Sequence, residues 1–419
     1  MRPSCPQLRW VMIALVFWAT VINYLDRQTL SVAAPVLIYD FHMSNVTYSR
    51  IIFAFMLAYT IMNGVAGPLI DRLGTRLGYA LTMAWWSASA MLHALATGPW
   101  SLGTYRFLLG MGEAGNWPAG VKVVAEWFPA PERALASGIF NSGSAIGAIL
   151  AAPLVAWTVL KFGWRVAFGV VGAAGFAWLL VWLLVYYAPG EVEQEQNPTP
   201  IPLVRLLRTR FVWSFTIAKA FLDPVWYFYI FWFPNYLRQA RHFDLASIGK
   251  YAWIPFFIGG AGNLLGGWFA GALLRRGVPL PIARKGSVTV FACLMVLAIP
   301  AVVVGDVRLA IALVSLAMLG STGVTANMLA MPADVFPKHV VASIWGVASL
   351  GSGLGGMVSS LTTGWVIDHY SYVPVFIGFG LVPFIAVLII WFFLGSLCPA
   401  FERCYCETDD HDSKNPGFV

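Results

Sequence analysis

The chain has little charge. Asp, Glu, Lys and Arg make up 11% of its 419 residues, whereas soluble domains carry about 25% charged residues. Hydrophobic residues make up 59% of the sequence, and the mean hydropathy is +0.73. Such a composition excludes an ordinary soluble globular protein, and it predicts a chain that crosses a lipid bilayer several times.

The sequence also lacks what an enzyme would need. No loop is long enough for a soluble catalytic domain, and no apolar run holds a nucleophile–base pair or a metal cluster. The five cysteines show neither a secreted disulfide pattern nor metal-site spacing. The net charge of +7 fits basic cytoplasmic loops better than a nucleic-acid surface. We therefore expect a membrane-embedded monomer with no enzymatic activity, no cofactor, no metal and no nucleic-acid partner.

Twelve apolar runs account for most of the chain. Each is predicted to be a helix, because an open strand would leave backbone polar groups unsatisfied in lipid. The expected spans are 10–34, 47–70, 78–97, 100–125, 134–158, 164–187, 211–236, 247–274, 284–304, 308–332, 340–367 and 372–397.

The basic residues predict the orientation of these spans. Of the 26 Lys and Arg residues, fifteen fall in segments on the side of the two termini, seven fall on the other side, and four lie within spans. Because cytoplasmic loops are enriched in Lys and Arg, both termini are expected to face the cytoplasm. The expected location is the inner or plasma membrane, crossed many times.

The second half of the chain repeats the first. The stretch 126–129 (Glu-Trp-Phe-Pro) returns 208 residues later as 334–337 (Asp-Val-Phe-Pro), and several glycines recur at the same offset. Such a repeat predicts an all-α fold of two pseudo-symmetric six-helix bundles. The expected division is bundle 1–188, cytoplasmic linker 189–210, bundle 211–397 and cytoplasmic tail 398–419.

Four charged residues lie well inside two of the spans, away from their ends. Asp26 and Arg27 lie in the first, and Arg106 and Glu113 lie in the fourth. Charges at such depth are costly unless they are paired or hydrated, and they usually mark a functional site. Arg106 and Glu113 lie about 10 Å apart along one helix, so we expect span 1 to supply their partners. A purely structural pair that pins the helices together is the alternative.

The turn between spans 2 and 3 reads Gly-Pro-Leu-Ile-Asp-Arg-Leu-Gly-Thr-Arg over 67–76. This stretch resembles the loop signature of the major facilitator superfamily. Asp71 is placed to accept hydrogen bonds from a neighbouring helix N-terminus or to pair with an Arg, which would latch the two bundles together. The expected gating motif consists of Gly67, Asp71, Arg72, Gly74 and Arg76.

A closer resemblance covers almost the whole chain. The stretches 23–27, 58–59, 106–114 and 126–129 resemble the anion:cation symporter branch of that superfamily, and 140–144 and 221–226 look most like its hexuronate carriers. The resemblance implies proton-coupled uptake of a sugar acid. It also implies that Asp26 and Glu113 are protonatable, that Arg106 partners a carboxylate, and that Tyr24, Arg27 and Tyr59 face the substrate.

Other polar and aromatic residues extend the candidate binding site. Lys219 and Asp223 lie four residues apart in span 7, so they can pair, and either a structural or a substrate-contacting role is open. Trp117 precedes a proline, where a polar-lined kink and a core contact are both possible. The further candidates for substrate contact, each with packing as the alternative, are Asn141, Ser144, Tyr227, Asn327 and Ser352.

The sequence thus predicts a secondary active symporter that imports a small organic anion by alternating access. A hexuronate such as glucuronate or galacturonate is the expected substrate, with H⁺ as the coupling ion. The nearest rival is an exchanger or Na⁺-coupled carrier of another organic anion, such as an aldonate or a dicarboxylate. A channel would be built from rings around a pore, which two six-helix repeats with an asymmetric charge cluster do not suggest.

Overall fold

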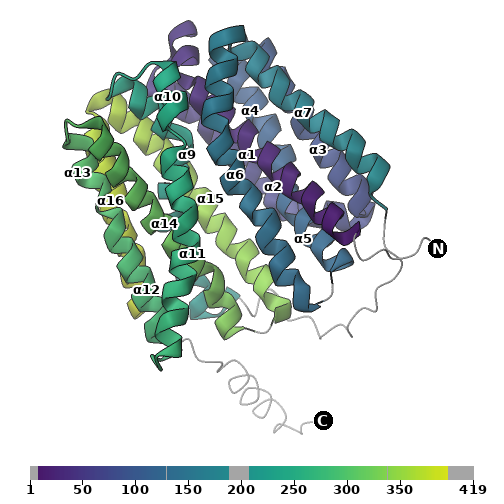
Figure 1. The fold of residues 1–419 in the computed structure, drawn as a ribbon, viewed down its shortest axis with the longest axis vertical. Helices are drawn as coiled ribbons and strands as arrows, with labels where there is room; N and C mark the ends of the chain where they lie inside the picture. The colour runs from purple at the N-terminus through teal and green to yellow at the C-terminus, as the bar shows by residue number, and fades with distance from the viewer. Residues whose placement is uncertain (1–7, 129, 188–206, 337, 395–419) are drawn as a thin grey trace, which may run out of the picture.

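A computed structural model of the chain describes residues 8–128, 130–187, 207–336 and 338–394, without the side chains of 71, 130–135, 333 and 338–343. These described residues form helices joined by short turns, and they contain no strand (Figure 1). The prediction of an all-α fold is confirmed.

The helices follow the predicted spans closely. The first half contains α1 (Leu8–Asp40), α2 (Asn45–Leu73), α3 (Thr75–Leu92) with the short η1 (His93–Leu95), α4 (Pro99–Glu113), α5 (Asn116–Trp127), α6 (Ala130–Phe162) and α7 (Trp164–Val185). The second half contains α9 (Arg210–Gln239), α10 (Leu245–Tyr251), α11 (Ile254–Arg275), α12 (Leu280–Met295), α13 (Ala298–Val303), α14 (Val307–Val335), α15 (Lys338–His369) and α16 (Tyr372–Phe392).

Three predicted spans are divided rather than continuous. The predicted 100–125 breaks between α4 and α5, 247–274 breaks between α10 and α11, and 284–304 breaks between α12 and α13. Within the described residues, nine helical segments are long and apolar enough to cross a membrane, with α10–α11 and α12–α13 each taken as one. The segments α3, α4–α5 and α9 would complete twelve, so that number stays a prediction.

Helix packing confirms the internal repeat. In the first half α1 packs on α6, α2 on α4, and α3 on α7. In the second half the corresponding pairs are α9 with α15, α11 with α14, and α12 with α16. Figure 1 shows these two halves side by side as two bundles. The predicted linker 189–210 and tail 398–419 lie mostly outside the described residues, so the proposed domain boundaries stay a prediction.

Glycines let α6 pack closely on α1 in the first bundle, and α15 on α9 in the second. A Cβ on Gly143 would lie 2.6 Å from the carbonyl oxygen of Phe17, and one on Gly147 would lie 2.6 Å from that of Val21. The repeat equivalents, Gly351 and Gly355, approach the backbone of α9 in the same way. A side chain at any of these positions would push the helices apart, as expected of small-residue packing in a membrane.

One end of the molecule holds the two bundles together through the N-terminus of α2. At this end, the carboxylate of Asp368 on α15 accepts hydrogen bonds from the backbone N–H groups of Asn45 (3.0 Å) and Val46 (2.7 Å), and from the Asn45 side chain (2.8 Å). The Asn45 side-chain oxygen accepts from Asn235 (3.0 Å) and Gln239 (3.2 Å) of α9. We call these contacts the clasp.

The clasp supplies acceptors that the first turn of α2 needs. Ser44 is the cap within the chain, because its hydroxyl accepts from the Thr47 backbone N–H at 3.1 Å. The N–H groups of Asn45 and Val46, which come before Thr47, need another acceptor, since the first turn of a helix has no intrahelical partners for them. Asp368 supplies that acceptor from the other bundle, where its negative charge also complements the helix dipole.

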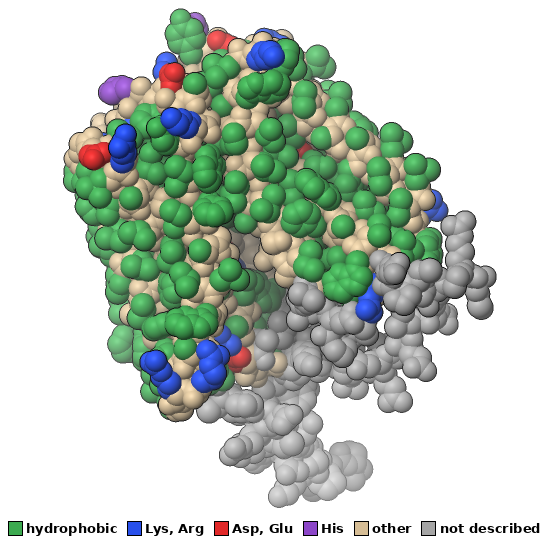
Figure 2. Space-filling model, in the orientation of Figure 1, with side chains coloured by type: hydrophobic (Ala, Val, Ile, Leu, Met, Phe, Trp, Pro, Cys, Tyr) green, Lys and Arg blue, Asp and Glu red, His purple; other side chains and the backbone are tan. Residues whose placement is uncertain are grey.

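The bundles separate toward the opposite end, where residues 8 and 394 lie. A Cβ added to Gly353 of α15 would still clash with Thr60 of α2. Beyond it, an added Cβ would meet no atom within 4 Å at four glycines: Gly64, Gly67, Gly138 and Gly346. Figure 2 shows the surface hollowed between the two bundles toward this end. The structure is therefore closed at the clasp and open at the terminal end.

Removing the clasp carboxylate should loosen the closed end. Loss of an N-cap costs about 1 kcal/mol, so Asp368→Ala is expected to shift the open–closed equilibrium at this end by about fivefold. Spin labels at Tyr39 and Tyr370, both highly exposed near the clasp, would report the distance between the bundles. The distance distribution should broaden toward longer values.

Asp306 offers a matched control. Its carboxylate caps α14 within one bundle, accepting from the Arg308 backbone N–H at 2.8 Å. Asp306→Ala should leave the inter-bundle distances unchanged. Identical distributions for wild type and Asp368→Ala would show that the clasp does not hold this end closed.

Candidate functional site

A buried ion pair joins α1 to the end of α4. The Nε atom of Arg27 donates to Oε2 of Glu113 at 2.6 Å, and the two side chains are 5% and 0% exposed. Glu113 is the last residue of α4, just before the break to α5. Charge-assisted contacts of this length are among the strongest hydrogen bonds in proteins. The prediction that span 1 supplies the partner of Glu113 is confirmed.

Arg106 and Asp26 lie together on the same two helices, but they are not directly paired by their charged groups. Nη2 of Arg106 donates to the backbone carbonyl of Asp26 at 3.3 Å. Both residues are almost completely buried. Arg106 therefore does contact span 1, as expected. The contact is to the backbone of Asp26 rather than to its carboxylate.

The four charged side chains keep unused hydrogen-bonding capacity. Among the described residues, no partner contacts Nη2 of Arg27, Oε1 of Glu113, Oδ2 of Asp26, or Nε and Nη1 of Arg106, although all are buried. Buried polar atoms are nearly always hydrogen-bonded. The cluster therefore has both donors that can bind an added anion and acceptors that can bind an added proton.

Aromatic rings surround the Arg27 guanidinium. Its Cζ atom lies 4.4 Å from the ring centroid of Tyr59, 5.2 Å from that of Tyr24 and 5.4 Å from that of Phe55. Cation–π contacts stabilise a positive charge without neutralising it. The rings thus hold the guanidinium in place without removing its charge.

The second bundle contributes a facing wall. Tyr227 of α9 and Ser352 of α15 are joined by a hydrogen bond between their hydroxyl groups at 3.1 Å. The Tyr227 ring stacks on Phe231 at 6.3 Å, and Phe231 meets Phe55 of the first bundle edge-on at 6.1 Å across the interface. On the same helix, Nζ of Lys219 lies 2.7 Å from Oδ2 of Asp223. The predicted pair therefore forms, and four predicted residues of the second bundle lie close to one another.

Of three predicted residues of the first bundle, one reaches the charged cluster and two do not. Ser144 interacts with the Tyr24 side chain and donates to the Asn141 carbonyl at 2.7 Å. Asn141 itself is exposed on α6. Trp117 packs against Phe140, with ring centroids 5.4 Å apart. The structure brings Ser144 to the cluster, and it places Trp117 and Asn141 in other surroundings.

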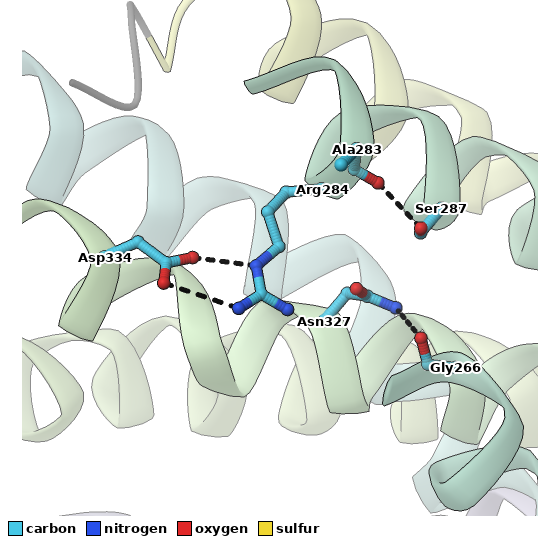
Figure 3. Close-up of polar contacts among 6 residues, drawn as sticks. All are labelled: Gly266, Ala283, Arg284, Ser287, Asn327 and Asp334. Atoms are coloured by element: carbon cyan, nitrogen blue, oxygen red, sulfur yellow. Dashed lines mark hydrogen bonds and ion pairs between the residues drawn. The ribbon is translucent and has the colours of Figure 1, made fainter. Parts of the chain in front are cut away.

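Asn327 lies within the second bundle, away from that wall. Its amide group donates to the backbone carbonyls of Gly266 (3.1 Å) and Gly323 (3.0 Å), which ties α14 to α11 (Figure 3). Figure 3 also shows Arg284 of α12 paired with Asp334 of α14, with Nε and Oδ2 2.8 Å apart. Both contacts join helices of one bundle, so the substrate-binding role predicted for Asn327 gains no support from its contacts.

The predicted gating motif forms the tight turn between α2 and α3. Gly74 has φ +76°, a left-handed conformation that glycine adopts without strain. The Arg76 guanidinium donates to the Leu183 carbonyl at 2.5 Å, which anchors the turn to α7, whereas Arg72 is exposed. The side chain of Asp71 lies outside the described residues, so its latch role stays a prediction.

Sequence reasoning missed several contributors. Phe55 completes the ring cage, and its spacing of four from Tyr59 is the signal that could have identified it. Asp368 gave no signal, because an acidic residue at a helix end looks like any exposed loop residue. The sequence also did not indicate that His93 is buried. Its side chain is fully buried, with Nδ1 2.7 Å from the Ser89 carbonyl oxygen and its ring stacked on Phe168.

The site offers no evident metal ligands. Within the described ranges, no three His, Cys, Asp or Glu side chains gather as metal ligands would. The Glu113 carboxylate is instead bound by the Arg27 guanidinium group, and Arg106 contacts the backbone of Asp26.

Comparison with known proteins identifies the family of the chain. A family model described as "Major Facilitator Superfamily" matches residues 16–320. The chain also shares its fold with a crystal structure of a bacterial homologue of the human lysosomal transporter Spinster. That match has a TM-score of 0.72 at 18% identity and covers 100% of both chains.

Curated relatives have transport functions. A hexuronate transporter of Escherichia coli K12 is 34% identical over 94% of this chain and 96% of its own length. A galacturonate transporter of Dickeya chrysanthemi is 37% identical over 69% of this chain and 89% of its own length. A probable galactarate/D-glucarate transporter of Escherichia coli K12 is 29% identical over 88% of this chain and 91% of its own length.

The Arg27–Glu113 pair should show strong energetic coupling. Breaking a buried pair by removing one partner costs about 3–5 kcal/mol, because the other charge is left uncompensated. Arg27→Met and Glu113→Gln should each destabilise the purified protein, and the double variant should lose less than the sum of the two losses. Thermal or denaturant unfolding in detergent would measure this cycle. Strictly additive losses would mean that the two charges do not depend on each other.

Proposed function

Because this chain belongs to the Major Facilitator Superfamily, we propose that it is a proton-coupled symporter that imports a sugar-acid anion by alternating access. A hexuronate such as glucuronate or galacturonate is the proposed substrate. The relatives named for hexuronate and galacturonate transport, which align over most of this chain, support that assignment.

The Arg27–Glu113 pair is the observation on which the proposal rests. A substrate carboxylate and the Glu113 carboxylate can compete for the same guanidinium group. Protonation of Glu113 neutralises it and frees Arg27 to bind the substrate, which presents a carboxylate of similar geometry. By linkage, a proton that favours anion binding is itself bound more tightly when the anion is present. One buried pair thus couples one proton to one anion.

Asp26 and Arg106 extend the same logic. The Oδ2 atom of Asp26 is buried with no hydrogen-bond partner among the described residues, and an unpaired buried carboxylate is costly when ionised. Protonation of Asp26 removes that cost and leaves the adjacent Arg106 less compensated. We propose Asp26 as a second protonatable group that raises the positive potential of the site when substrate binds.

The orientation inferred from the basic loops assigns a side to each end. With the termini in the cytoplasm, the clasp lies on the outer surface and the hollow opens to the cytoplasm. The structure then represents an inward-facing state. Transport requires the clasp to open and the terminal end to close, and the predicted Asp71 latch is the candidate contact for that closure.

Two alternatives remain within the same fold. A Na⁺-coupled carrier would need oxygen ligands with little positive charge nearby, but the Glu113 carboxylate is bound by Arg27, and Arg106 contacts the backbone of Asp26. An exchanger would need no protonatable pair at the site. The buried carboxylates therefore favour proton coupling over both alternatives.

Glu113→Gln removes the titrating group while keeping the size of the side chain. In proteoliposomes, this variant should lose accumulation of glucuronate driven by a pH gradient but retain binding or exchange. Glu126→Gln is the matched control, since Glu126 contacts Thr75 and Tyr186 at the terminal end of the bundle. Wild-type accumulation by Glu113→Gln would remove Glu113 from the coupling role.

Arg27 should bind the substrate carboxylate directly. A charge-assisted contact contributes about 1.5–3 kcal/mol, so Arg27→Ala should weaken glucuronate binding at least tenfold. Arg27→Lys keeps the charge without the planar fork, and it should retain part of the preference for the acid over neutral glucose. Binding to folded, monodisperse variants would be measured by calorimetry. Unaltered affinity in Arg27→Ala would move carboxylate recognition to Lys219.

A further inference from the structure

Lys219 is a further buried cation near the site, on the second bundle, and Asp223 masks its charge. Its ammonium group lies 2.7 Å from the Asp223 carboxylate and 4.7 Å from the ring centroid of Trp345. The Lys219 and Asp223 side chains are 9% and 19% exposed. A pair this well buried costs more to break than a surface pair, so Lys219 stays neutralised unless another anion replaces Asp223.

This pair faces the same site as Arg27. Lys219, Asp223 and Tyr227 follow one another at intervals of four, which places them on one face of α9. Tyr227 stacks on Phe231, with ring centroids 6.3 Å apart, and Phe231 meets Phe55 beside Arg27 edge-on at 6.1 Å across the interface. The pair therefore lies on the side of α9 that contacts the Arg27 bundle, with Tyr227 and its Ser352 partner between the pair and Phe231.

The charges of the two walls limit how many carboxylates the site can accept. Arg27, Arg106, Asp26 and Glu113 sum to zero, and protonation of one carboxylate leaves a single net positive charge for a substrate carboxylate. A six-carbon aldarate carries a second carboxylate at the other end of its chain. That group would reach toward the α9 wall, where Asp223 already occupies the available cation and would itself repel the incoming charge.

We propose that Asp223, by masking Lys219, makes this protein select sugar acids with one carboxylate over those with two. The inference rests on the proposed function, since it concerns the substrate class of the same site. Specificity then arises from a repulsive group as well as from an attractive one. Uronates and aldonates fit this charge pattern, and aldarates do not.

The test compares glucarate with glucuronate. Asp223→Asn keeps the shape of the side chain but frees the Lys219 charge. The ratio of the glucarate Kd to the glucuronate Kd, measured by calorimetry on the full-length protein in detergent, should fall by about tenfold or more, the usual size of one charge-assisted contact. Adding Lys219→Met to Asp223→Asn should restore the wild-type ratio, because the freed cation is then absent.

Asp334→Asn is the matched control. It also frees a basic residue of the second bundle, Arg284, but that pair joins α12 to α14 within the bundle (Figure 3). Its Kd ratio should equal that of the wild type. If Asp223→Asn unfolds, Asp223→Ser provides the same loss of charge in a smaller side chain.

The outcomes separate this inference from the proposed function. If the wild-type protein binds no sugar acid, the proposed function fails. If the wild type binds glucuronate and Asp223→Asn leaves the Kd ratio unchanged, or weakens both ligands in parallel, the selectivity role of Asp223 is wrong while the proposed function stands. A fall in the ratio that survives the added Lys219→Met change would also overturn it, because Lys219 would not be the group responsible.

Discussion

The rest of the site depends on one buried contact, the ion pair between Arg27 and Glu113. Two charges that deep in a bundle are tolerated only because they satisfy each other, and either one alone would destabilise the fold. The surroundings keep the pair in place without neutralising either charge. The rings of Tyr24, Phe55 and Tyr59 hold the guanidinium from several sides.

Backbone packing fixes the position of that cation. Gly147 lets α6 approach α1 so closely that an added Cβ would lie 2.8 Å from the Cβ of Tyr24. Tyr24 is three residues before Arg27, so the same approach sets which face of α1 points into the site. The break after Glu113 ends α4 where its carboxylate meets α1. Glycine contacts that look purely structural therefore determine the geometry of the charged cluster.

Hydropathy and the repeat predicted much of the fold, and the charges within spans 1 and 4 predicted the centre of the site. Features that depend on how the two bundles meet could not be predicted. The Asp368 clasp needs the end of α15 to lie at the start of α2, and no local pattern carries that register. Asn327 shows the same limit, because a polar residue in an apolar helix can face either a site or a neighbouring backbone, and here it binds backbone carbonyls. The helix breaks at 114–115, 252–253 and 296–297 also depend on tertiary structure. An apolar run has the same sequence pattern whether its helix is continuous or divided.

The number of protons taken up on binding tests most directly whether the substrate and Glu113 compete for Arg27. Calorimetric titration of the purified protein with glucuronate, in buffers of different ionisation enthalpy and over a pH series, measures the protons taken up per bound anion. We expect uptake of about one proton by the wild type in the pH range where Glu113 is ionised without substrate. Less uptake is expected in Glu113→Gln. Glucuronate binding with no proton uptake by the wild type at any pH would contradict competition between the substrate and Glu113.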